Sequence, residues 1–265
     1  MGDPVIIAID AVRDGQAGGV VSAGNTGALM AMAKVVLRTL AGIHRPAISS
    51  FFPTLRGESV MLDLGANVEC DADNLVQFAV MGDVFARTVL GLASPTVGLL
   101  NVGAEELKGH EYLRTAAAMI RDGNLPLNFH GFIEGDDVCA GTVDVVVTDG
   151  FTGNVALKMA EGTARLYAGF RRGAFESSLT ARVGYLLARH AIEKVRQRTD
   201  PRRYNGAMFL GLNGIVIKSH GGTDALGFAN AVGVAVDLLV NRVNDRIRTE
   251  IERITAAPKP QAATG

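Results

Sequence analysis

The stretch from Val143 to Asn154, which reads VDVVVTDGFTGN, decides the fold class. It joins an apolar run rich in valine to a turn rich in glycine, and a helix is predicted to follow from Val155 to about Arg171. A continuous valine-rich run is typical of a strand that is buried on both faces. A strand, a tight turn and a helix in this order indicate a βα unit of a parallel sheet.

The same alternation recurs along the chain. Strands are predicted at 19–23, 59–64, 96–102, 129–133 and 214–218, and helices at 8–14, 27–40, 72–90 and 105–121. We therefore predict an α/β fold, a three-layer α/β/α sandwich with a largely parallel sheet. We expect one catalytic domain over residues 1–255 and a disordered tail over 256–265.

Composition supports a large buried core and few special sites. Of 265 residues, 48% are apolar and 20% are charged, and the 32 glycines far outnumber the 8 prolines. Glycine at this level indicates many tight turns. The net charge of −1 does not indicate a nucleic-acid partner. Cys70 and Cys139 lack metal-ligand spacing, which argues against a zinc site or a disulfide framework and fits the cytoplasm.

One segment, about 165–205, departs from this pattern. Between Arg165 and Arg203 ten Lys/Arg oppose three Asp/Glu, a local charge of +7 that leaves −8 for the rest of the chain. Apolar residues at helical spacing lie between these charges, so we predict a protruding helical hairpin. Its charge and apolar stripe suit anionic lipid headgroups or an acidic carrier protein, and a dimer interface is the alternative.

Five turns at predicted strand termini combine glycine with asparagine. They are 24–27, 65–67, 101–103, 150–154 and 213–214. Glycine lets backbone amides approach a ligand, and the helix that follows adds its positive end. Since ligands collect at the carboxyl ends of parallel strands, we expect these turns to meet at one edge of the sheet and bind a phosphate-like anion.

Two cations and one histidine lie near these turns. Lys108 and Lys218 can serve a phosphate as point charges, and His220 can donate to an oxyanion or shuttle a proton. No Gly-x-Ser-x-Gly elbow or Gly-x-Gly-x-x-Gly turn is present, so neither a serine nucleophile nor a dinucleotide site is indicated.

Five blocks of sequence resemble one known family. They are Ser22–Leu29, Leu62–Val68, Thr148–Val155, Asp200–Ala207 and Leu210–Gly222. In this order they resemble bacterial phosphate acyltransferase, the acyl-[acyl-carrier-protein]:phosphate acyltransferase of phospholipid synthesis. The resemblance implies attack of inorganic phosphate on an acyl carrier protein thioester, with no metal and no cofactor. It also implies a fold like that of isocitrate and isopropylmalate dehydrogenases, and a dimer at the inner face of the cytoplasmic membrane.

The resemblance runs from about Ala8 to Ile254. The family's amino-terminal segment, with an Asp-Ala-Met-Gly-Gly-Asp-type block, has no counterpart, so we expect a chain shortened relative to the family. Loss of that segment would expose a strand edge and remove one wall of the site. An inactive anion-binding or membrane-associated homologue is therefore one alternative function.

We predict that phosphate lies among the amides of 25–27 and 152–154. The predicted catalytic residues are His220, Lys218, Asn25 and Asn154. The predicted phosphate- or substrate-binding residues are Gly24, Thr26, Gly27, Asp63, Gly65, Asn67, Asn101, Gly103, Lys108, Asp149, Gly150, Thr152, Gly153, Asn213, Gly221 and Gly222. Preorganised donors should stabilise the thioester oxyanion, and His220 alternatively protonates the leaving thiolate.

Two further enzymes stay open as alternatives. A phosphotransacetylase-like enzyme would take the acyl group from coenzyme A, whereas the basic hairpin favours acyl carrier protein. A decarboxylating dehydrogenase of the same fold would need an aspartate cluster for a metal, and only Asp63 and Asp149 are candidates. The expected partners are acyl carrier protein, phosphate, an anionic membrane surface and a second copy, with no nucleic acid.

Overall fold

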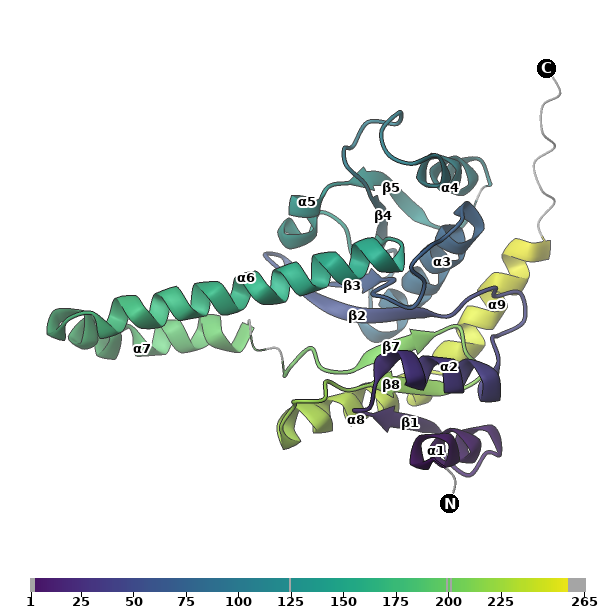
Figure 1. Cartoon of the computed structure of the whole chain (residues 1–265). Helices are drawn as coiled ribbons and strands as arrows, with labels where there is room; N and C mark the ends of the chain where they lie inside the picture. Colours follow the sequence, from purple (N-terminus) through teal and green to yellow (C-terminus); the bar gives the residue numbers. More distant parts are fainter. Residues whose placement is uncertain (1–2, 124, 199, 201, 257–265) are drawn as a thin grey trace.

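The computed structural model describes residues 3–256 except 124, 199 and 201. The predicted tail falls mostly on residues 257–265, which lie outside that range. An eight-stranded sheet lies between two layers of helices, and two helices extend from this body as a hairpin (Figure 1). The strands are β1 (Gly19–Ser22), β2 (Ala47–Thr54), β3 (Gly57–Leu62), β4 (Thr96–Leu100), β5 (Asn128–Ile133), β6 (Val145–Val147), β7 (Ala207–Leu210) and β8 (Ile215–Lys218).

The helices follow the strands in alternation along much of the chain. They are α1 (Pro4–Arg13), α2 (Thr26–Leu37), α3 (Ala72–Val89), α4 (Glu111–Asp122), α5 (Gly135–Ala140), α6 (Gly150–Glu176), α7 (Leu179–Arg198), α8 (Ala225–Val240) and α9 (Val243–Ala256). One face of the sheet packs against α3, α4, α8 and α9, and the other packs against α1, α2, α5 and α6. The three layers therefore match the predicted class.

The sheet is mixed, so the prediction of a largely parallel sheet is wrong. Its order is β1-β8-β7-β2-β3-β6-β4-β5, and in the described chain four of the seven neighbouring pairs are parallel. The other three pairs involve β2 and β7, which the sequence pattern did not reveal. β2 carries polar Ser49 and Ser50 and ends near Pro53, so it lacks the continuous apolar run of the other strands.

These two strands reverse the sheet at its middle. As a result β1, β8 and β2 run in one direction, while β7, β3, β6, β4 and β5 run in the other. One residue of each strand lies in a common row across the sheet: Val21, Ile217, Met208, Ser49, Leu62, Val147, Leu99 and Phe132. The strands of the four parallel pairs all end within about one residue of this row. The chain leaves the row in one direction after β1 and β8, and in the opposite direction after β3, β6, β4 and β5.

The glycine–asparagine turns therefore do not share one edge, as we had expected. Those after β3, β6 and β4 lie on one side of the row. The one after β1 lies on the other side, next to the glycine turn that follows β8, and the turn at 213–214 precedes β8. Helix α6 connects the two sides, because it begins directly after β6 and runs back across the sheet. Its side chains pack on the face of the sheet that α1, α2 and α5 also cover, through Ala156, Leu157 and Ala160.

Helices α6 and α7 form the hairpin that extends from the body in Figure 1. Large apolar side chains on both helices are exposed, among them Phe170, Leu186 and Leu187. No single helix in the described part of the chain is long and apolar enough to cross a membrane; α8 and α9 pass that test only as a pair bent by 53°.

Among the helix starts that differ from the sequence prediction, those of α4 and α6 have a clear local cause. Helix α4 starts at Glu111 instead of Glu105, because the preceding residues form a turn in which the Lys108 amide donates to the Glu105 carbonyl. Helix α6 starts at Gly150, five residues before the predicted position, because Asp149 caps it by accepting from the Thr152 amide.

Candidate active site

One group of predicted residues gathers at the ends of β3 and β6, and we call it the Asp63 cluster. It comprises Asp63, Gly65, Asn67, Asp149, Gly150, Thr152 and Gly153. Asp63 is its centre and is fully buried. Its carboxylate accepts from the backbone amides of Ile48, Ala66 and Asn67 at 2.9, 3.0 and 2.7 Å.

Further donors complete this arrangement. The Gly65 amide reaches the carboxylate at 3.3 Å and the Asn67 side-chain amide at 3.0 Å. Burial raises the pKa of Asp63, while these hydrogen bonds act in the opposite direction. With its oxygens engaged and no exposed surface, Asp63 supports the loop after β3. The predicted direct contact between Asp63 and phosphate is therefore corrected to a supporting role.

The amino terminus of α6 closes against this loop. The Gly150 amide donates to the Asn67 carbonyl at 2.7 Å, and the Thr152 amide donates to the Asp149 carboxylate at 2.8 Å. A Cβ atom at Gly153 would lie 1.9 Å from the Asp63 carbonyl oxygen. Glycine is required there because the helix touches the backbone of β3. These amides serve the protein itself, so this helix start offers little to an anion.

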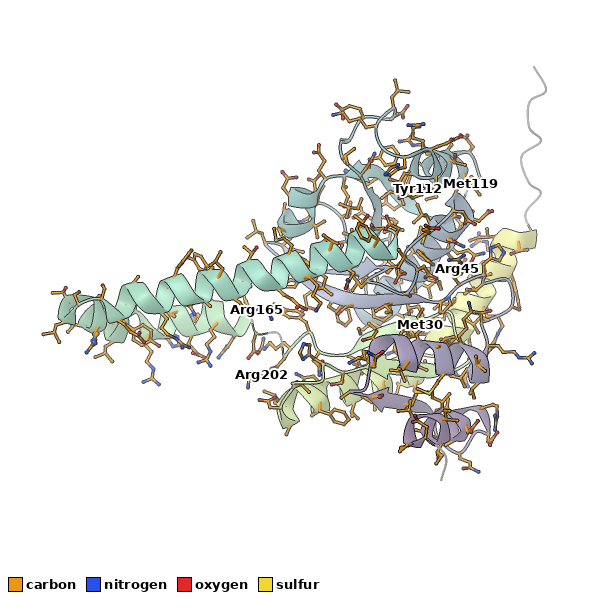
Figure 2. All side chains as sticks on the ribbon, viewed as in Figure 1. Met30, Arg45, Tyr112, Met119, Arg165 and Arg202 are labelled. Atoms are coloured by element: carbon orange, nitrogen blue, oxygen red, sulfur yellow. The ribbon has the colours of Figure 1, made fainter. Side chains whose placement is uncertain are left out.

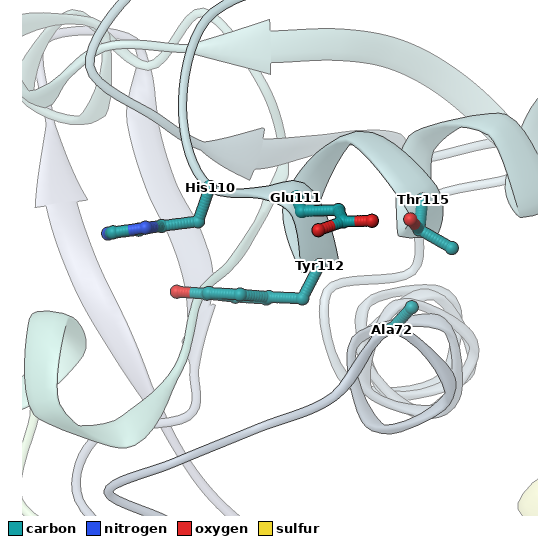
Figure 3. Close-up of a pocket in the computed structure, with 5 residues that line it drawn as sticks. All are labelled: Ala72, His110, Glu111, Tyr112 and Thr115. Carbon is teal, nitrogen blue, oxygen red and sulfur yellow. The ribbon is translucent and has the colours of Figure 1, made fainter.

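A pocket lies beside the Asp63 cluster. It has a volume of about 490 Å³ and is lined by Ala72, His110, Glu111, Tyr112 and Thr115 (Figure 3). The rings of His110 and Tyr112 stack with centroids 5.5 Å apart. The Tyr112 hydroxyl donates to Asp149 at 3.1 Å. Burial raises the pKa of Tyr112 to about 12, and the charge of Asp149 and this hydrogen bond act in the same direction.

A second group lies where β1 and β8 end, and we call it the Lys218 cluster. It comprises Gly24, Asn25, Thr26, Gly27, Lys218, His220, Gly221 and Gly222. The two strands are joined by the Ser219 amide, which donates to the Ser22 carbonyl at 2.9 Å. A Cβ atom at Gly221 would lie 3.4 Å from the Ala23 carbonyl oxygen, so the two glycine turns are in contact.

The amino terminus of α2 in this cluster is open. The Asn25 side chain caps the helix by accepting from the Ala28 amide at 3.0 Å. Within the part of the chain that the structure describes, the amides of Thr26, Gly27 and Gly221 donate to no protein acceptor. Unpaired amides at a helix start favour a bound anion.

His220 is held so that its imidazole faces outward. Its backbone amide donates to the Asn205 side chain at 2.8 Å, and Asn205 in turn donates to Ser219 and Gly227. The Nδ1 atom accepts from the Gly222 amide at 3.2 Å. In the neutral ring the proton is therefore assigned to Nε2, which is exposed and can donate to a ligand.

Lys218 is half-buried at the end of β8. Its Nζ donates to the Ser219 carbonyl, and in the described chain it has no carboxylate partner. Burial lowers the pKa of Lys218, and the charge of Lys158 on α6 lowers it further. This electrostatic effect of Lys158 connects α6 with the Lys218 cluster.

The remaining predicted residues lie elsewhere. The Asn101 side chain accepts from Val102 and donates to Lys108, so it holds its own loop. Lys108 packs over buried Gly103 and pairs with Glu105 at 2.8 Å. Asn213 precedes β8, and its side chain donates to the Thr39 carbonyl at 2.8 Å. Its assignment to the common sheet edge is wrong, because it lies at the opposite end of β8 from Lys218.

Three residues near the site were missed. Asn205 lies in Asp200–Ala207, one of the five blocks that resemble the family, so the sequence did point to it. Lys158 follows Asn154 by one helical turn. The sequence prediction started α6 at Val155; with the start at Gly150, both residues would have been placed on one side of the helix. Tyr112 had no signal, because the sequence does not show that α4 meets Asp149. Among the described residues, no three His, Cys, Asp or Glu side chains gather as metal ligands.

The sequence has close relatives. The family model "Fatty acid synthesis protein" matches residues 3–246. A phosphate acyltransferase of Rhodospirillum centenum is 71% identical over 251 residues, which cover 95% of this chain and 71% of the relative. A phosphate acyltransferase of Paramagnetospirillum magneticum is 66% identical over 95% of this chain and 72% of its own length. The chain belongs to the phosphate acyltransferase family. Like these relatives, it is an enzyme of acyl transfer.

Solved structures agree on the fold. A phosphotransacetylase from Streptococcus pyogenes superposes with a TM-score of 0.56 and 18% identity, over 93% of this chain and 67% of that chain. The EutD phosphotransacetylase from Staphylococcus aureus superposes with a TM-score of 0.52 and 16% identity, over 94% of this chain and 67% of that chain. At such identities the likeness concerns the arrangement of strands and helices. The phosphate acyltransferase family thus shares a mixed α/β fold with phosphotransacetylases.

Proposed function

We propose that this enzyme transfers a fatty acyl group from the thioester of acyl carrier protein to inorganic phosphate and releases acyl phosphate for phospholipid synthesis. The observation that carries the proposal is the Lys218 cluster. It combines free amides of Thr26, Gly27 and Gly221 with a half-buried lysine and an exposed imidazole. Phosphate acyltransferase relatives at 71% and 66% identity support phosphate as the acceptor.

The reaction needs positioning more than activation, because phosphate is already an anion at pH 7. Lys218 and the α2 amides hold phosphate while one of its oxygens attacks the thioester carbonyl carbon. A C–O bond forms, and the carbonyl oxygen becomes an oxyanion that Asn25 or Asn154 stabilises by donating its side-chain amide. When the C–S bond breaks, its electron pair goes to sulfur, and His220 in its imidazolium form supplies the proton from Nε2. The P–OH proton of the transferred phosphate then returns to the ring, so the proton of the thiol comes in the end from phosphate.

The direct test incubates the purified chain with acyl-[acyl-carrier-protein] and phosphate and measures free thiol and acyl phosphate. We expect thiol release that depends on phosphate, and a loss of about 100-fold in kcat/KM for phosphate in Lys218→Met, since a charge-assisted contact is removed. Equal rates with acyl-coenzyme A would favour the phosphotransacetylase-like alternative. Absence of acyl phosphate would favour a non-catalytic homologue. His220→Ala with unchanged acyl phosphate formation would exclude the proton-donor role.

We also propose that the hairpin of α6 and α7 contacts the acidic carrier protein and an anionic membrane surface. Leu186 and Leu187 are 66% and 85% exposed on a helix rich in arginine. Changing both to Asp should abolish flotation with anionic liposomes, and Leu55→Asp, at an exposed turn of the body, should not. Retained flotation of the double variant would remove the lipid part of the proposal.

Three finer features belong to the same proposal. The enzyme forms a homodimer, acts in the cytoplasm at the inner face of the membrane, and has the topology of isocitrate and isopropylmalate dehydrogenases. It needs no metal or organic cofactor. The exposed apolar residues of α6, such as Leu166 and Phe170, support a contact between two copies. Sedimentation at several concentrations tests the dimer, and a monomer at all of them would exclude it.

A further inference from the structure

One flank of α6 carries an ordered row of polar side chains. Asn154, Lys158, Glu161 and Arg165 follow one another at spacings of four, three and four residues, so they lie on one side of the helix. Figure 2 shows Arg165 on the side of α6 that faces β7 and β8. The row therefore starts beside Gly65, where Asn154 lies, and continues along the side that faces the Lys218 cluster.

The row is short of negative charge. Lys158 Nζ pairs with Glu161 at 3.0 Å, and Arg165 approaches the same carboxylate oxygen at 3.9 Å. One carboxylate thus serves two cations. Lys158 and Arg165 are 55% and 74% exposed, so both can reach a ligand beside the helix.

Lys218 faces this row from the sheet. It lies two residues after Val216, which packs in the core beneath α2 and α6, and side chains two apart in a strand point to the same face. Lys218 has no carboxylate partner in the described chain, and among the described residues its Nζ donates only to the Ser219 carbonyl. Lys218 on the sheet and Lys158 on α6 therefore lie on the same side of the sheet, and the charge of Lys158 acts on Lys218. The acid beside Lys158 is Glu161, which Arg165 shares.

Two like charges near each other raise the free energy of the folded protein unless an anion lies between them. A phosphate carries two negative charges near neutral pH and accepts hydrogen bonds from several directions, so it can satisfy both lysines. We propose that Lys158 is a second phosphate-binding residue, which contacts from α6 the anion that Lys218 and the α2 amides hold from the sheet side. This assignment rests on the proposed function. It adds a residue of α6 to the phosphate site that Lys218 and the α2 amides form.

A purely structural role for Lys158 makes a different prediction. If Lys158 serves only to pair with Glu161 on the helix surface, then removing either partner has the same small effect. If Lys158 binds phosphate, then Lys158→Gln weakens phosphate binding, whereas Glu161→Gln frees the lysine and leaves binding equal or tighter. The two variants alter one ion pair from its two ends, so each is the matched control of the other.

The experiment measures KM for phosphate and for the acyl donor in both variants and in Lys158→Arg. We expect Lys158→Gln to raise KM for phosphate about 10-fold, since one charge-assisted contact is lost, with KM for the acyl donor changed less than about 2-fold. Lys158→Arg should recover much of the loss. Equal KM values for phosphate in Lys158→Gln and Glu161→Gln would overturn the assignment.

Binding of inorganic phosphate without acyl donor separates this assignment from the reaction. Phosphorus-31 line broadening gives Kd for phosphate in wild type and variants, and circular dichroism melting confirms folding. If wild type binds phosphate but transfers no acyl group, the proposed function fails while the Kd of Lys158→Gln still decides the role of Lys158. An unchanged Kd in that variant, or no binding to wild type, overturns the assignment.

Discussion

The amino termini of α2 and α6 follow similar glycine–asparagine turns but are used in opposite ways. At α6, the Gly150 amide donates to Asn67 and the Thr152 amide to Asp149, and Gly153 touches the backbone of β3. At α2, the amides of Thr26 and Gly27 have no acceptor among the described residues. One helix start is part of the core, and the other is available to a ligand.

This difference shows why such a turn alone does not define a binding site. A helix start presents unpaired amides and a partial positive charge, and the protein itself satisfies them when a loop is close enough. The loop after β3 does so at α6 through Asn67, which Asp63 holds in place. At α2 no carbonyl of the described residues accepts from the Thr26 or Gly27 amide, and the turn that carries His220 and Gly221 contacts the turn before the helix.

The largest expected effect is at Gly153. Gly153→Ala places a Cβ atom against the Asp63 carbonyl oxygen, a backbone atom that cannot turn aside, and we expect a loss of about 3 kcal/mol in the free energy of unfolding. Gly162→Ala on the same helix meets nothing within 4 Å and should be neutral or stabilising by about 0.5–1 kcal/mol. Urea denaturation measures both. Equal stability of the two variants would show that the close contact between Gly153 and the Asp63 carbonyl is not needed to hold α6.

A smaller, selective effect is expected at Thr26. Proline is favoured at the first helical position, and Asn25 already has the extended backbone that precedes proline, so Thr26→Pro should change stability by less than about 0.5 kcal/mol. It removes an amide donor and should raise KM for phosphate about 10-fold. Thr26→Val keeps the amide and loses the hydroxyl. If Thr26→Pro has the KM of wild type, the α2 amides do not hold phosphate.

The sequence predicted the α/β layers and most helices, because continuous valine runs and helical periodicity are local signals. It missed β2, whose apolar run is interrupted by Ser49 and Ser50, and β7, whose apolar run is four residues long, and with them the reversal of the sheet. That reversal separates the Asp63 cluster from the Lys218 cluster. Asn213 lies apart from Lys218 because it precedes β8, whereas Lys218 is the last residue of that strand. The Lys218 cluster was predictable because its residues are near in sequence, whereas Lys158 and Tyr112 reach the site only through tertiary packing.

The smallest expected effect concerns the charge state of Lys218. Burial and Lys158 lower its pKa below the ordinary 10.5, so it loses its proton at lower pH than an exposed lysine. KM for phosphate should therefore rise on the alkaline side before pH 10.5, and Lys218→Arg should shift that rise upward. In the same window the folded protein binds fewer protons than the unfolded chain, so the free energy of unfolding should increase slightly with pH. Nothing comparable is expected at α6, whose Gly150 and Thr152 amides already donate to Asn67 and Asp149. A pH profile of KM identical in wild type and Lys218→Arg would mean that phosphate binding at α2 does not depend on this lysine.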